Sequence, residues 1–140
     1  MPRPDAALGE AARVVRPGGF LQFSILHPCF APPHRRTLRN ADGTVRAVEL
    51  ADYYAGLDGE VESWSFPSAP PDIRAAHPPF QVPRFHRPLA WWLNAVPGAG
   101  LALEAADEPM ADRVTADAVP AVADTRVVPL FLILRARRPS

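Results

Sequence analysis

Apolar positions recur at helical spacing near the start of the chain and then change to a continuous run. The helical positions are Leu8, Ala11, Ala12 and Val15. This spacing predicts a helix, which the turn at residues 17–19 ends because proline cannot continue a helix and glycine accepts a positive φ. The near-continuous apolar run of residues 20–26 predicts a strand, and we expect burial on both of its faces, as in a parallel sheet.

A second helix and two further strands are predicted in the last third of the chain. The helix covers residues 87–96, where Leu89, Trp92, Leu93 and Val96 follow the i, i+3, i+4, i+7 rule. The segments 101–107 and 126–136 read as strands, with Pro129 at the entry to the second, which we expect to be buried on both faces through its centre. The polar stretch between these two strands, residues 108–125, is expected to be a loop.

The middle of the chain, residues 31–84, is rich in proline, glycine and charge, with aromatic residues interspersed. Asp42-Gly43 lies between two potential strand arms and predicts a hairpin, and residues 60–66 read as another short strand. A loop-rich segment of this length is usually functional or disordered, and its aromatic residues, which include Phe66, favour an ordered cover over a linker. The order of all these elements indicates an α/β fold with a thin layered sheet.

Composition narrows the class of protein. The chain has 140 residues, enough for one domain, and is 48% hydrophobic, so we expect it to fold. Fifteen basic and fifteen acidic residues cancel, which argues against a broad surface for nucleic acid or anionic membrane. The single cysteine fits a reducing compartment, no signal-peptide pattern is present, and the apolar run of residues 130–134 is too short to span a bilayer. We therefore expect a soluble, cytoplasmic protein.

Four motifs in order resemble the C-terminal half of class I S-adenosylmethionine-dependent methyltransferases, of the small-molecule, methyltransferase type 11-like kind. The motifs lie in "LGEAARVVRPGGFLQFSILHPCF", "FHRPLAWWLNAVPGAG", "LALEAADEP" and "VVPLFLILRARR". The resemblance implies a partial Rossmann-like sheet made of the last three strands, the final one antiparallel and placed between the other two. Residues 1–140 would form one partial domain, with 31–84 as its substrate-side insertion.

The glycine-rich cofactor loop that this family carries after its first strand has no counterpart in the chain. Gly18-Gly19 ends a helix, and Gly98-x-Gly100 follows a helix rather than a strand. The resemblance thus implies S-adenosylmethionine as cofactor but assigns no cofactor-binding residue, and we expect the isolated chain to be inactive. Residues 20–26 would keep a bare strand edge, which predicts self-association or a complementing chain.

Two histidines are candidate catalytic residues for transfer to a small-molecule acceptor. His27 lies just past a strand, where α/β sheets place their sites, and His86 lies just before a helix. Alternatively, His27 is only a turn residue before Pro28, and His86 only helps to start the helix. Candidate residues for binding the acceptor are Tyr53, Tyr54, Trp64, Phe85 and Arg87. Those aromatic side chains could instead form the insertion's own small core.

No metal site is expected, because His27, Cys29 and His34 match no standard zinc spacing. Glu108 belongs to an acidic loop whose charges are expected to be solvated, with an acceptor-facing role as the minor alternative.

Three hypotheses remain open from the sequence. The first is a truncated methyltransferase that needs its missing half, and the second is a non-catalytic half-domain that serves as an interaction or ligand-binding module. The third is a start codon assigned too far downstream, with Met1 internal to a full enzyme. The methyl acceptor and its reacting atom are not identified.

Overall fold

A computed structural model of the chain describes residues 2–64 and 69–140. In chain order the elements are α1 (Pro4–Val14), β1 (Phe20–Leu26), β2 (His34–Arg39), β3 (Val45–Ala51), β4 (Asp58–Trp64), α2 (Pro71–Ala76), β5 (Phe80–Phe85), α3 (Leu89–Gly98), β6 (Ala102–Asp107), α4 (Arg113–Ala118), the 3-10 helix η1 (Pro120–Arg126) and β7 (Phe131–Arg137). The α/β class predicted from the sequence is confirmed. In the described part of the chain, no helix is long and apolar enough to cross a membrane.

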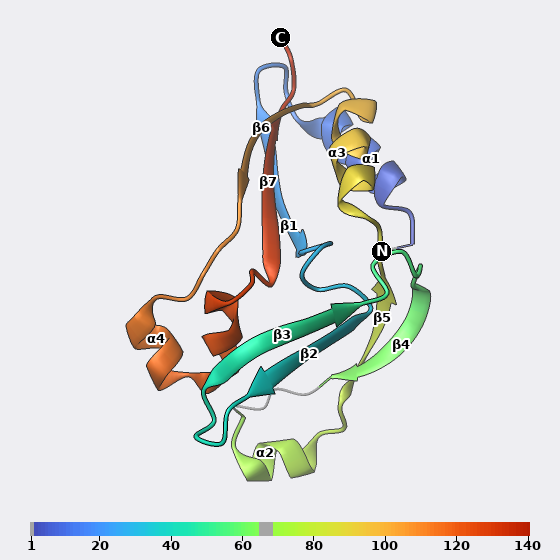
Figure 1. The fold of residues 1–140 in the computed structure, drawn as a ribbon. Coiled ribbons are helices and arrows are strands. Elements are labelled where there is room, and N and C mark those ends of the chain that lie inside the picture. The colour runs from blue at the N-terminus through green and yellow to red at the C-terminus, as the bar shows by residue number, and fades with distance from the viewer. Residues whose placement is uncertain (1, 65–68) are drawn as a thin grey trace.

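The central sheet has the strand order β1-β7-β6, and β7 runs antiparallel to both of its neighbours. β1 and β6 therefore run parallel to each other, and their carboxyl ends lie at the same edge of the sheet. Figure 1 shows the β2–β3 hairpin lying across this lower edge, with β4 and β5 beside it. Residues that follow β1 and β6 are thus brought to the place where the insertion meets the sheet.

Helices α1 and α3 pack on one face of the central sheet (Figure 1). The buried core residues are Ala12, Val96, Leu101, Leu132, Leu134 and Ala136. Leu21, Phe23 and Ile25 of β1 pack against this core, and the Phe23 and Trp92 rings lie 6.1 Å apart. The helical spacing predicted Val96 and Trp92 on the packed side, but Leu93 is exposed.

The expectation that residues 20–26 are buried on both faces is wrong. Alternate side chains of a strand point to opposite faces, and in β1 the exposed and partly buried positions alternate along the whole strand. Phe20 and Leu26 pair across the sheet with Arg137 and Phe131 and share the second face. Because α1 and α3 both cover the first face, Phe20 remains 48% exposed and Phe131 43% exposed. The same holds for β7, whose alternate residues are only partly buried.

The predicted hairpin at Asp42-Gly43 is confirmed by the β2–β3 pair. Gly43 adopts a φ of 84°, and the Asp42 carboxylate accepts a 2.9 Å hydrogen bond from the Thr44 N–H. The predicted strand at residues 60–66 is confirmed as far as Trp64, and Phe66 lies outside the described residues. The sequence patterns missed α2 and β5, which complete the insertion as a second hairpin with a short helix between its strands.

The expectation of a loop at residues 108–125 is also wrong, because α4 and η1 occupy most of this segment. Asp112 caps α4: its carboxylate accepts a 2.8 Å hydrogen bond from the Thr115 N–H. This hydrogen bond is the main reason why the pKa of Asp112 is lowered. In the sequence, Asp112 at this position is the capping residue that indicates the start of α4.

Glu104 fastens β6 to β7 on the surface of the sheet. Its carboxylate accepts a 2.6 Å hydrogen bond from Arg137 and a 2.7 Å hydrogen bond from Arg135. The hydrogen bond from Arg137, followed by that from Arg135, lowers the pKa of Glu104. The edge strand β6 is thus held to β7 by charge as well as by its backbone pairing.

Candidate functional site

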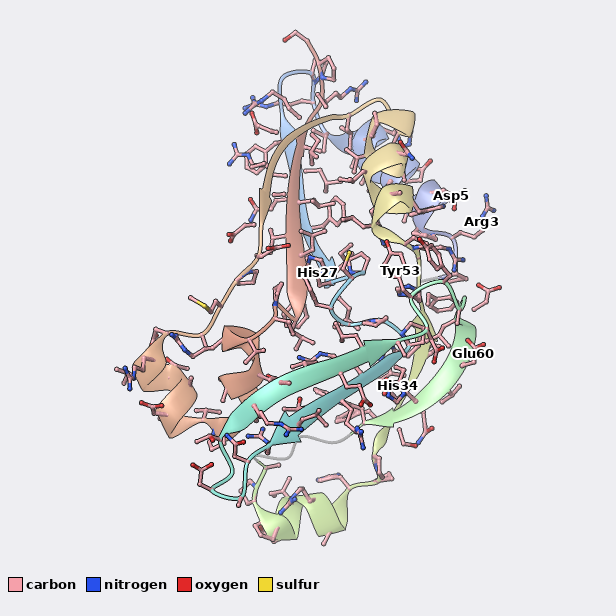
Figure 2. The ribbon with its side chains drawn as sticks, in the orientation of Figure 1. Arg3, Asp5, His27, His34, Tyr53 and Glu60 are labelled. Carbon is pink, nitrogen blue, oxygen red and sulfur yellow. The ribbon has the colours of Figure 1, made fainter. Side chains whose placement is uncertain are left out.

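The side chains of His27 and Glu108 meet at the carboxyl edge of the central sheet. His27 directly follows β1 and Glu108 directly follows β6, so the parallel course of these two strands brings the residues together. His27 Nε2 lies 2.8 Å from Glu108 Oε1. His27 is only 2% exposed, whereas the Glu108 side chain is 54% exposed. The pair therefore presents a carboxylate to solvent from a buried imidazole (His27 is labelled in Figure 2).

Both ring nitrogens of His27 have partners. Nδ1 accepts a 3.1 Å hydrogen bond from the Cys29 N–H, so Nε2 carries the ring proton and donates to Glu108. The ring also lies against Phe30, with 4.7 Å between the ring centroids. The backbone N–H of His27 donates to the Leu130 carbonyl at 2.8 Å. His27 is thereby fixed in orientation and holds Glu108.

His86 carries its ring proton on the same nitrogen as His27 but differs in the partners of its two nitrogens. It is 7% exposed, and its Nε2 lies 2.8 Å from the Tyr53 carbonyl oxygen, so Nε2 is the protonated nitrogen. Tyr53 is held in turn, because its hydroxyl accepts a 2.9 Å hydrogen bond from the Leu89 N–H at the start of α3. Among the described residues, Nδ1 of His86 has no hydrogen-bond partner, which leaves its lone pair available.

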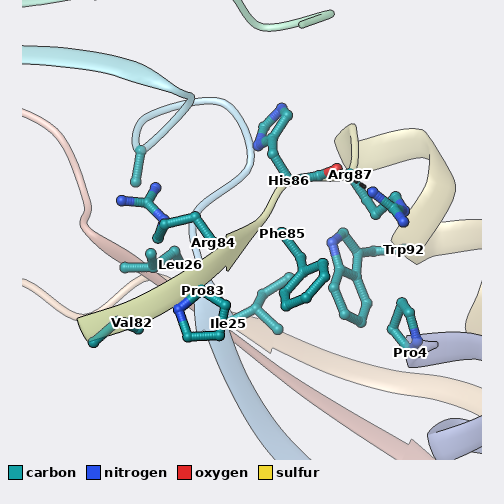
Figure 3. A pocket seen from close by; sticks show the side chains of 11 residues that line it. Pro4, Ile25, Leu26, Val82, Pro83, Arg84, Phe85, His86, Arg87 and Trp92 are labelled. Carbon is teal, nitrogen blue, oxygen red and sulfur yellow. Dashed lines mark hydrogen bonds between the residues drawn. The ribbon is translucent and has the colours of Figure 1, made fainter. Parts of the chain in front are cut away.

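Two of the predicted acceptor-binding residues, Phe85 and Arg87, line a cavity of about 270 Å³ together with His86. We call this cavity the helix-side cavity. Its other walls include Ile25 of β1 and Trp92 of α3. Figure 3 shows Phe85 beside Trp92, while the His86 ring points away from both. Mostly apolar surface therefore lines the space next to this histidine.

Trp64 lines a different cavity of about 510 Å³, which we call the hairpin cavity. Its remaining lining residues are Leu26, Ala31, Pro32, Pro33, Arg35, Glu62, Val82, Arg84, Leu130 and Phe131. Tyr54 is 87% exposed and lies edge-on to Tyr53, with 4.9 Å between the ring centroids. The structure thus divides the predicted acceptor-binding residues between two cavities and a surface pair rather than gathering them in one pocket.

Two residues of these sites did not stand out in the sequence. The sequence predicts Glu108 mainly as a solvated charge, and it does not indicate Arg35 as a binding residue. The signal for Glu108 was its position after a strand that runs parallel to β1, which places both ends at one edge. No group of three or more metal-ligating side chains forms within the described ranges, and His27, Cys29 and His34 are not gathered around one point.

Comparisons with known proteins place the fold. No family model and no curated protein sequence matches the chain. A solved S-adenosylmethionine-dependent methyltransferase from Mesorhizobium loti matches with a TM-score of 0.62 and 24% identity, over 96% of this chain and 55% of that one. A putative S-adenosylmethionine-dependent methyltransferase from Listeria monocytogenes matches with a TM-score of 0.68 and 17% identity, over 97% and 55% respectively. The chain thus spans about half the length of these structures.

Gly18, Gly19 and Gly100 do not form a cradle for S-adenosylmethionine. Gly18, with a φ of 72°, lies at the amino end of β1, and its N–H donates to the Arg138 carbonyl. Gly19 packs so tightly that an added Cβ would lie 2.8 Å from the Arg16 carbonyl oxygen. Gly100 follows α3 rather than a strand. These three glycines shape turns and do not form a cradle for the cofactor, and the fold is similar to that of the two solved methyltransferases.

Proposed function

We propose that this chain forms the acceptor-side half of an S-adenosylmethionine-dependent methyltransferase that acts on a small molecule. The observation that carries the proposal is the likeness to two methyltransferase structures, which extends over 96–97% of the chain. The cofactor-binding half would come from a further segment of polypeptide or from another chain. Methyl transfer by residues 1–140 alone is not expected.

The polar groups at the carboxyl edge suit the acceptor side of such a reaction. A hydroxyl or amine acceptor loses a proton during methyl transfer, and a positioned base accelerates this loss. We assign the proton-accepting role to His86 through its free Nδ1. The Glu108 carboxylate is the second candidate for this role. His27, with both nitrogens occupied, acts as the positioning residue for Glu108. Tyr53 keeps the His86 ring in place.

The open edge of β1 is the proposed contact for the complementing half. β1 pairs only with β7 among the described strands, and an unpaired edge is a template for strand addition. The exposed apolar side chains of Phe20, Leu26 and Phe131 share the sheet face next to this edge. The two solved methyltransferases extend well beyond the part that this chain matches, and that remainder is the occupant we propose.

Calorimetric titration with S-adenosylmethionine tests the proposal in two steps. The first titrates the chain alone, where no heat of binding is expected, and micromolar binding would overturn the argument for a missing half. The second titrates a mixture of the chain with the unmatched half of the Mesorhizobium loti protein, produced as a separate polypeptide. The proposal requires a stable complex that binds the cofactor.

Labelled methyl transfer separates the enzyme from a simple interaction module. The complex would be incubated with methyl-tritiated S-adenosylmethionine and small phenols and acids, and His86→Gln would be compared with the exposed control His77→Gln. Loss of transfer in the first variant alone supports the roles given above. Formation of the complex without cofactor binding would instead favour the non-catalytic half-domain.

A further inference from the structure

The hairpin cavity lies where the three sheets formed by the described residues meet. Leu26 and Phe131 come from the central sheet, Arg35 from β2, and Trp64 and Arg84 from the β4–β5 hairpin. Its volume of about 510 Å³ lies in the range of small-molecule sites, which are mostly apolar with a few placed polar groups. Leu26 ends β1, so the cavity opens at the carboxyl edge of the sheet, beside the turn that holds His27.

Arg35 is the placed polar group in this cavity. Its Nε donates a 3.0 Å hydrogen bond to the Phe30 carbonyl, and its Nη1 lies 2.8 Å from Asp124 Oδ2. Asp124 is itself 7% exposed and accepts a 3.0 Å hydrogen bond from the Thr37 hydroxyl. The guanidinium is therefore held at two of its three nitrogens, and no rotamer freedom is left to lose when a ligand binds.

The third nitrogen of Arg35, Nη2, is buried without a hydrogen-bond partner among the described residues. Buried charged donors are normally paired, because an unsatisfied N–H keeps its full desolvation cost. A carboxylate is a strong partner for such a nitrogen, because charge-assisted hydrogen bonds are among the strongest in proteins. The free nitrogen thus indicates an acceptor that the described residues do not supply.

The charges around the cavity favour a ligand with no more than one negative charge. Arg84 is paired with Glu62 at 2.6 Å, and Arg35 with Asp124, so two cations and two carboxylates already balance. Glu62 is 53% exposed and lies toward solvent, whereas the Arg35 and Asp124 side chains are 17% and 10% exposed. A carboxylate at the Arg35 end lies away from the Glu62 charge and adds one net negative charge, whereas a dianion such as phosphate would add two.

We propose that the hairpin cavity binds a monocarboxylate carried on a flat apolar body, with the carboxylate on Nη2 of Arg35. The apolar body would pack against Leu26, Val82 and Phe131. As a statement about the methyl acceptor, this inference rests on the proposed function, and it makes the acceptor a small aromatic or unsaturated acid. As a statement about binding, it stands on the cavity alone and needs no cofactor.

The test is an NMR titration of the isotopically labelled chain, carrying Gln22→Lys and Ser24→Lys outside the cavity to keep it monomeric, with benzoate and with its neutral isostere benzamide. We expect benzoate to bind about tenfold more tightly, the effect of one charge-assisted hydrogen bond at a partly solvated site. Shifts should centre on the amides of the hairpin cavity. Equal affinity for the two compounds, or shifts centred elsewhere, would overturn the inference without any mutation in the cavity.

Arg35→Lys and Arg36→Lys form a matched pair of variants. Lysine at position 35 keeps the charge beside Asp124 but lacks the second terminal nitrogen, whereas Arg36 is exposed and pairs with Glu49 outside the cavity. Arg35→Lys should bind benzoate about tenfold more weakly and benzamide as tightly as before. Arg36→Lys should bind both compounds as tightly as before. Equal behaviour of two folded variants would refute the assignment to Arg35. Cofactor binding by the complemented protein is measured separately, so either proposal can fail while the other stands.

Discussion

The hydrogen bonds of His27 give the sharpest prediction about stability. His27→Phe keeps a ring of similar size at a site that is 2% exposed, but it removes the partner of the Cys29 N–H and the partner of Glu108. A hydrogen bond contributes about 1 kcal/mol net, so loss of both should destabilise the protein by about 2 kcal/mol. Glu108 is 54% exposed and can turn to water, so Glu108→Gln should cost less, about 0.5 kcal/mol.

Urea unfolding, followed by the fluorescence of the three tryptophans, measures both variants and their combination. The double-mutant cycle should give a coupling of about 0.5 kcal/mol between positions 27 and 108, because the two side chains touch. Asp107→Asn, an exposed neighbour on the same strand end, is the control and should be neutral. A His27→Phe variant as stable as the wild type, or strictly additive effects, would show that the pair does not form. Imidazole ¹⁵N shifts offer a second check, since the structure requires the proton on Nε2 of His27.

Three further outcomes are expected. The chain alone should self-associate in sedimentation velocity at micromolar concentration. The double change Gln22→Lys, Ser24→Lys on the exposed side of β1 should make it monomeric. A monodisperse, cooperatively melting wild type would contradict the argument from the unpaired strand edge. Because the β7 arginines lower the pKa of Glu104, its carboxylate adds stability above the ordinary glutamate pKa of about 4.3, and this is lost as the pH falls through the lowered value. Glu104→Gln should therefore weaken the fold at pH 7 and progressively less below pH about 4, and a pH-independent loss in urea titrations would refute this. Leu134→Ala in the fully buried core should cost about 2–5 kcal/mol in the same assay, against less than about 1 kcal/mol for Leu103→Ala at a 43% exposed site.

Periodicity and turn residues located the strongest elements. The helices α1 and α3, the strands β1, β6 and β7, and the Asp42-Gly43 hairpin were all predicted, because each combines a clear apolar period with proline or glycine at its end. The short α2, β5 and α4 were missed or taken for loops. Six residues carry too little periodicity to separate a helix or strand from an irregular segment, and only the pairing of β5 with β4 defines that strand.

The candidate site was predicted in part. His27 and His86 were singled out by their positions beside a strand end and a helix start, but the sequence did not indicate that one histidine has both ring nitrogens occupied and the other has one free. Hydrogen-bond partners come from distant segments, 81 residues apart for His27 and Glu108. Arg35 illustrates the same limit, since its guanidinium is defined by Asp124, a residue of a segment expected to be a loop.

The sequence by itself determined the local elements, the α/β class and the likeness to a methyltransferase, because these follow from short-range period and from motifs of a few residues. Only the tertiary structure decided which faces are buried and which groups meet. β1 reads as a fully buried strand, yet burial requires a covering layer on each side, and the described helices cover one face. The pairing of His27 with Glu108 and the free nitrogen of Arg35 likewise depend on where the ends of the strands meet in space.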